Sequence, residues 1–179
     1  MFYLFLADGF EETEALAPLD MMRRAKIEVK TVGVTGEVVT GSHGVPVTAD
    51  LKPEEISYND IDGVVLPGGM PGTINLIKSD AVAKATTYCF ENNKITAAIC
   101  AAPSVLGNLG ILKGKKATCF PGFEKELEGA TYTAAPVEVD GNVITGKGAG
   151  CAILFGKAIV EKVLSAEAAN KVCGDMQCP

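Results

Sequence analysis

The hydrophobic and polar positions of the chain alternate between short apolar runs and longer stretches with apolar residues at helical spacing. Apolar runs of four to eight residues favour buried strands, and longer amphipathic stretches favour helices. The pattern predicts main strands at 2–7, 28–34, 61–69, 95–100, 115–120 and 141–146, and helices at 11–25, 103–112 and 150–165, with one or two more within 73–92. This alternation predicts an α/β fold, with a doubly wound, mostly parallel sheet sandwiched between helices.

Residues 37–50 (EVVTGSHGVPVTAD) interrupt the alternation with Gly and Pro. Extended chain broken in this way favours a hairpin outside the main sheet. We see no internal repeat, low-complexity tract or linker, and 179 residues suit one core. The sequence therefore predicts a single domain over 1–179.

Composition narrows the class of protein. The chain is 47% hydrophobic and 21% charged, as in compact globular proteins. Its net charge of −6 and the absence of a basic run argue against nucleic-acid binding. No basic region precedes the apolar hexamer at 2–7, and Pro, Asn, Ser and Gly interrupt the uncharged stretch 95–112. We therefore expect neither a signal peptide nor a membrane span, and a cytoplasmic location.

The cysteines are scattered without a CxxC pair: they are Cys89, Cys100, Cys119, Cys151, Cys173 and Cys178. In a reducing compartment we expect no structural disulfide. With one histidine and no suitably spaced thiols, we also expect no metal site. Cys173 and Cys178 resemble a metal or redox pair, but the expectation is two loose, solvent-facing thiols.

Three loops compete for a functional site, because ligands of open α/β sheets bind beyond the carboxyl ends of the strands. They are DGFEETE at 8–14, PGGMPG at 67–72 and CAAPS at 100–104. The loops supply carboxylates, backbone N–H groups and a thiol.

Cys100 lies where a buried strand is predicted to turn sharply into a helix. This is the geometry of a nucleophile elbow, in which the reactive residue has strained backbone angles and tolerates only small neighbours, here Ala98 and Ala102. Amides at the start of the following helix would favour the thiolate. The alternative is a buried core cysteine.

The Gly68–Gly69 turn would allow backbone N–H groups to point into the site and, with the Ala101 amide, form an oxyanion hole. Alone, the glycine pair fits an ordinary turn, and it lacks the G-x-G-x-x-G spacing of a dinucleotide site.

Three glutamates, Glu11, Glu12 and Glu14, begin the first predicted helix. Negative charge there stabilises the helix dipole, which explains such a cluster without a catalytic role. One protonated glutamic acid near Cys100 would instead donate a hydrogen bond to the thiolate and carry a proton. Spacing alone leaves open which glutamate does so.

Four segments, ADGFEETEALAPLDMMRRA, VVLPGGMPG, AAICAAPSVL and ITGKGAG, occur in the order and spacing of the ThiJ/PfpI superfamily. The chain resembles that superfamily nearly end to end, and most of all its DJ-one branch. The resemblance implies a flavodoxin-like, class I glutamine amidotransferase-like domain and a homodimer. It also implies that Cys100 is the nucleophile, that Glu14 hydrogen-bonds it, and that Gly69 and Ala101 supply backbone donors.

Two positions depart from the family pattern. Phe120 stands where some relatives place a histidine near the cysteine, so a Cys-His pair there is impossible. His43 stands where relatives often have an arginine that faces the partner subunit's site. We include Met70 and Arg24 with these two as candidate pocket or dimer-contact residues.

The resemblance implies an enzyme without metal or organic cofactor that acts on small reactive carbonyls such as methylglyoxal and their early adducts. The alternative is a redox sensor or holdase chaperone that uses oxidation of Cys100. A third reading, a peptidase or amidotransferase, would normally require the absent histidine.

Overall fold

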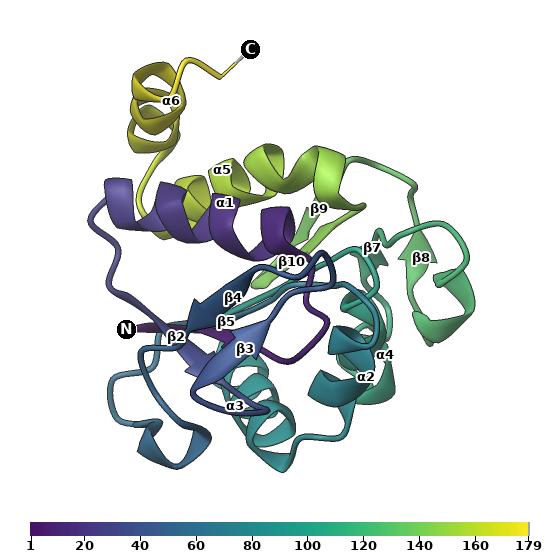
Figure 1. The fold of residues 1–179 in the computed structure, drawn as a ribbon. Coiled ribbons are helices and arrows are strands. Elements are labelled where there is room, and N and C mark those ends of the chain that lie inside the picture. Colours follow the sequence, from purple (N-terminus) through teal and green to yellow (C-terminus); the bar gives the residue numbers. More distant parts are fainter. Residues whose placement is uncertain (179) are drawn as a thin grey trace.

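The computed structural model describes residues 1–178 and contains a central six-stranded sheet in the order β2-β1-β5-β6-β10-β9 (Figure 1). Its strands are β1 (Phe2–Leu6), β2 (Val29–Gly33), β5 (Gly63–Leu66), β6 (Ile95–Ile99), β9 (Val137–Asp140) and β10 (Val143–Gly146). Five strands run parallel, and β9 pairs antiparallel with β10 at one edge. The predicted mostly parallel sheet is therefore confirmed.

Helices cover both faces of this sheet. They are α1 (Glu12–Arg24), α2 (Gly72–Ile77), α3 (Asp80–Glu91), α4 (Pro103–Asn108), α5 (Ala152–Val163) and α6 (Ala166–Asp175). Short 3-10 turns lie at Pro53–Glu55, Glu124–Glu126 and Ala149–Cys151. The layers match the predicted sandwich.

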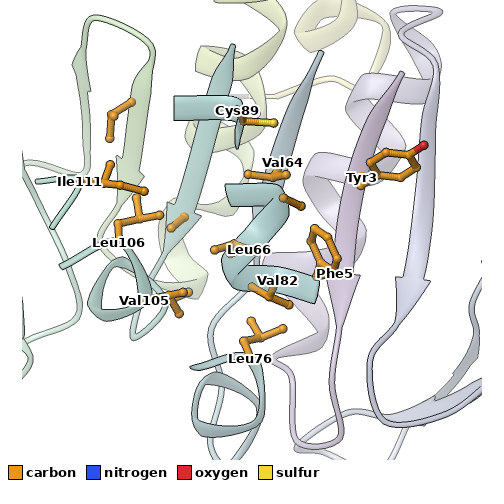
Figure 2. Close-up of a cluster of buried hydrophobic side chains, with 14 of the residues drawn as sticks. Tyr3, Phe5, Val64, Leu66, Leu76, Val82, Cys89, Val105, Leu106 and Ile111 are labelled. Atoms are coloured by element: carbon orange, nitrogen blue, oxygen red, sulfur yellow. The ribbon is translucent and has the colours of Figure 1, made fainter. Parts of the chain in front are cut away.

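The two faces of β1 show how the sequence builds two cores. Tyr3 and Phe5 point to one face, where they meet side chains of α2, α3 and α4 such as Leu76 and Val82 (Figure 2). Phe2, Leu4 and Leu6 point to the other face, toward α1, α5 and α6. A strand buried on both sides needs a continuous apolar run, which FYLFLA provides.

The region 37–50 forms the expected hairpin outside the main sheet, with strands β3 (Val38–Thr40) and β4 (Pro46–Thr48). The predicted strand at 115–120 is wrong as a main-sheet strand. Only Lys116–Ala117 is extended there (β7), and it pairs with β8 (Thr131–Tyr132) in a separate two-stranded sheet. Just beyond β7, the Thr118 N–H donates to the Thr145 hydroxyl on β10, so a side-chain bond takes the place of strand pairing.

One helix boundary and two further elements also differ from the prediction. The helix expected at 103–112 ends at Asn108, because Gly110 adopts a left-handed φ of +71°. The edge strand β9 and the helix α6 were not predicted. No helix within residues 1–178 is long and apolar enough to cross a membrane.

Candidate active site

Cys100 directly follows β6 and has a φ of +66°, a backbone conformation that few non-glycine residues adopt. Two backbone hydrogen bonds hold it there. Its N–H donates to the Gly146 carbonyl, and its own carbonyl accepts from the Phe120 N–H, both at 2.8 Å. The sharp, strained turn expected at Cys100 is therefore present.

The turn is packed so closely that its neighbours must be small. Ala98 and Ala102 are both fully buried. A Cβ atom on Gly68 would lie 2.8 Å from the Cys100 Cβ and 2.7 Å from Glu14 Oε2. Glycine is therefore required at position 68 by the approach of both side chains.

Backbone N–H groups surround the sulfur. Those of Ala101 and Gly69 hydrogen-bond with the Cys100 thiol and act to lower its pKa. The Gly68 N–H, expected among the oxyanion donors, instead donates to Glu14 Oε2 at 2.9 Å. That expectation was wrong, because the Gly68 N–H is already bonded to the buried Glu14 carboxyl group, which needs a hydrogen-bond partner.

Glu14 is the glutamate that reaches the thiol. It is fully buried in the first half of α1, and its Oε1 atom lacks a well-formed hydrogen bond within residues 1–178. Burial raises the pKa of Glu14 to about 7, although its interactions with Cys100 and the Gly68 N–H oppose the rise. A carboxyl group with this pKa exchanges a proton readily near neutral pH.

The electrostatics of Cys100 differ from the expectation of a simple lowered thiol pKa. Burial, followed by the charge of Glu14 and its hydrogen bond, raises the pKa of Cys100 to about 12. Beyond burial, the rise reflects two acidic groups that share one site, where they cannot both ionise. As pH rises above about 7 the pair comes to hold a single proton, which lies either on sulfur beside a carboxylate or on Glu14 beside a thiolate.

The other two glutamates have structural tasks. Glu11 caps α1, since its Oε2 atom accepts from the Glu14 N–H at 2.7 Å. Glu12 Oε1 accepts from the His43 N–H at 2.8 Å, and Glu12 Oε2 lies 2.9 Å from His43 Nδ1. Partial burial acts against ionisation of Glu12, but hydrogen bonds from the His43 side chain and from backbone N–H groups lower its pKa to about 2.

The remaining candidates occupy different places. His43 is exposed, and its hydrogen bond with Glu12 raises its pKa. Met70 and Phe120 are about half exposed, and the Phe120 backbone is bonded to Cys100. Arg24 pairs with Asp20 at 2.7 Å in the last turn of α1, ten residues beyond Glu14 and therefore roughly 15 Å along the helix axis. The structure therefore does not place Arg24 beside Glu14 and Cys100.

The sequence did not predict the cluster of Glu11, Glu12 and His43, whose ligand atoms lie within 4.8 Å of one another. Carboxylate oxygens and an imidazole nitrogen are ligand types that metal ions bind. Their hydrogen bonds already cap α1 and anchor the His43 loop, which accounts for the cluster without an ion.

This chain belongs to the DJ-1/PfpI family, whose model matches residues 2–162. It is 41% identical over 165 residues to DJ-1 homolog B of Arabidopsis thaliana, covering 90% of this chain but 37% of that protein. It is 36% identical over 143 residues to a deglycase of Thermococcus kodakarensis, covering 79% of this chain and 86% of the relative. The structure of oxidised Toxoplasma gondii DJ-1 superposes with a TM-score of 0.94 at 31% identity, covering 98% and 97% of the two chains.

Proposed function

We propose that this protein is a cysteine-dependent glyoxalase or deglycase that acts on methylglyoxal-type carbonyls and their early adducts. The observation that carries the proposal is the buried Glu14–Cys100 pair with the Ala101 and Gly69 N–H groups on its sulfur. The name of the Thermococcus relative, a deglycase, supports the same class of reaction.

In the first step, the Cys100 sulfur forms a bond to the aldehyde carbon of methylglyoxal. The carbonyl π bond breaks, the proton shared with Glu14 goes to the new oxygen, and a hemithioacetal results. The Ala101 and Gly69 N–H groups stabilise negative charge as it develops on that oxygen.

In the second step, Glu14 as carboxylate removes the proton from the former aldehyde carbon and returns it to the neighbouring carbon, while the hydroxyl proton of the hemithioacetal passes to the former ketone oxygen. The hemithioacetal thereby becomes a thioester of lactate with no net oxidation. Water then cleaves the thioester, releasing lactate and restoring the thiol. The chain supplies both the nucleophile and the proton carrier, so the proposal needs no cofactor.

The test is lactate formation from methylglyoxal without added cofactor, by the wild-type protein, by Cys100→Ala and by Cys151→Ser as a matched thiol control. We expect turnover by the wild type and by Cys151→Ser and none by Cys100→Ala. Equal lactate formation by all three proteins would refute the proposal.

We also propose that the protein forms a homodimer, as the family resemblance implies. Val38 and Val45, on the β3–β4 hairpin and its turn, are 56% and 45% exposed and offer apolar contact area on the hairpin that also carries His43. In such a dimer His43 would approach the partner subunit's Cys100. The mass of the protein in solution tests the assembly.

A redox-sensing role for the same cysteine is the second candidate. It is favoured by the part-exposed position of the Cys100 thiol and by the solved oxidised form of the Toxoplasma relative. A sensor would keep its response to peroxide when carbonyl turnover is absent, whereas the proposed enzyme loses turnover once Cys100 is oxidised.

A further inference from the structure

A second thiol site lies where α6 ends. Gln177 adopts a left-handed φ of +56°, and its N–H donates to the Gly174 carbonyl at 3.1 Å. The next N–H, that of Cys178, reaches back to the Cys173 carbonyl at 2.9 Å. These two bonds define a Schellman motif, a chain reversal that closes a helix.

The Schellman motif brings together the side chains of its first and last residues, and this contact is commonly apolar. Here those residues are Cys173 and Cys178, and their thiols lie close enough to hydrogen-bond. Cys173 packs partly against the core beneath α6, and both residues remain partly exposed. The two cysteines are thus a preformed pair, where the sequence had indicated loose thiols.

We propose that Cys173 and Cys178 form a redox-active dithiol, distinct from the Cys100 site, that hydroperoxides convert to an intrachain disulfide. The Schellman motif holds the two sulfurs together in the reduced protein, so little conformational entropy is lost when the bond closes. Disulfides require this kind of close approach between the two backbones.

The reaction takes two balanced steps. One thiol attacks the hydroperoxide: the O–O bond breaks, an alcohol or water leaves, and the sulfur becomes a sulfenic acid. The second thiol then attacks that sulfur, the S–S bond forms, and water leaves. The sulfurs together lose two electrons and the hydroperoxide gains them.

Cys178 is the better candidate for the first step. The pKa of Cys173 is raised by burial, by the neighbouring Cys178 and by their hydrogen bond, and only Lys157 on α5 opposes this. The Cys173 thiol therefore keeps its proton more strongly than an ordinary thiol does, and it suits the resolving role.

The test uses the full chain carrying Cys100→Ser, so that the first site contributes no oxidised sulfur. The protein is treated with hydrogen peroxide, its free thiols are alkylated, and it is cleaved with trypsin. Cleavage after Lys171 leaves both cysteines in one peptide, which begins VCGDMQC. We expect this peptide to lose two hydrogen atoms, take up no alkyl group, and take up two alkyl groups after reduction.

Two variants at Gln177 test whether the motif is the cause. Gln177→Gly suits the left-handed conformation and should close the disulfide at least as fast as Gln177. Gln177→Val disfavours that conformation because its side chain is β-branched, and it should slow closure several-fold. Equal rates in the two variants would show that the geometry contributes nothing.

Other outcomes also overturn the proposal. They are two alkylated thiols after peroxide treatment, sulfinic acids without a disulfide, or a disulfide that joins two chains. In the Cys100→Ser chain, Cys173→Ser should abolish the disulfide. In the chain that keeps Cys100, Cys173→Ser should leave lactate formation from methylglyoxal unchanged. The proposal of a Cys173–Cys178 dithiol and the proposal of carbonyl turnover at Cys100 can therefore be refuted separately.

Discussion

The Gly68 N–H donates to Glu14 Oε2 at 2.9 Å, and this bond fixes the buried carboxyl group beside Cys100. Three segments meet there, since Glu14 lies on α1, Gly68 follows β5 and Cys100 follows β6. Strands β1, β5 and β6 are neighbours in the sheet, so the segments that follow them lie side by side at the carboxyl ends of the strands. These segments are α1, the glycine turn and Cys100. The sheet topology thus assembles the site.

The first prediction concerns the three glutamates. Glu14→Ala should lower carbonyl turnover by about 10²–10⁴-fold, because general acid-base assistance is typically worth that much. Glu11→Ala should cost about 1 kcal/mol of stability through loss of the helix cap, with little change in turnover. Steady-state kinetics and denaturant unfolding of each variant measure both effects. Glu12→Ala should also change turnover little, and three equally mild effects on turnover would contradict the assignment of Glu14.

A second prediction follows from the pKa of Glu14, raised from 4.5 to about 7 by burial. The folded protein binds the Glu14 proton more tightly than the unfolded chain does. The contribution of Glu14 to stability is therefore complete below pH 4.5 and is lost as pH rises through 7. The loss approaches about 3 kcal/mol at high pH. In Glu14→Gln this fall should disappear, whereas Glu37→Gln, at an exposed position, should keep it. Free energies of unfolding between about pH 5 and pH 9 measure the difference, and equal slopes would count against the buried acid.

The sequence predicted the position of Cys100 at a sharp strand-to-helix turn better than it predicted the margins of the fold. Cys100 could be found because a thiol between small residues at a strand end is a local signal. The role of Gly68 could not, since it depends on Glu14, a residue 54 positions away that meets it only in the folded chain. The choice among the glutamates also required burial, which separates Glu14 from Glu12 where spacing does not.

The elements that the sequence missed have weak local signals. The edge strand β9 is only four residues long and is partly exposed, so its pairing with β10 is what defines it. Helix α6 begins at the Ser165 cap only two residues after α5 ends, and the last predicted helix, 150–165, stopped at that point, so α6 was missed. The contact between Cys173 and Cys178 depends on the left-handed Gln177, which is not a glycine and so gave no turn signal.

A third prediction tests the packing at the glycine turn. Gly68→Ala should abolish turnover and cost about 1–3 kcal/mol of stability, because the added Cβ meets Cys100 and Glu14. Gly150→Ala is the matched control, since a Cβ there has no atom within 4 Å. Thermal unfolding and lactate formation compare the two. An active, stable Gly68→Ala variant would contradict this prediction, because it would show that Cys100 and Glu14 can move aside for the added Cβ atom.

A fourth prediction ranks the thiols toward peroxide. Cys100 should be oxidised before Cys89 and Cys119, because those two are fully buried and burial raises their pKa values to about 12 and 11. The pKa of Cys100 is also raised, but its sulfur is accessible and Glu14 can take its proton. Mild peroxide followed by peptide mass spectrometry measures the order. Earlier modification of Cys89 or Cys119 would remove the argument for a reactive site at Cys100.

The last prediction concerns His43 and rests on the proposed homodimer. Its hydrogen bond with Glu12 raises the pKa of His43, so the imidazolium persists to a higher pH than in a free histidine. Beside the partner subunit's Cys100 it would favour the thiolate, and this help would fade as pH rises through the raised pKa. His43→Ala should therefore raise the pKa of Cys100. His43→Arg should preserve reactivity and flatten its dependence between about pH 6 and pH 8, because arginine stays charged. Thiol alkylation rates across this range, measured with the mass in solution, test both variants. A monomer, or unchanged alkylation profiles, would leave His43 as the anchor of its own loop through Glu12 and nothing more.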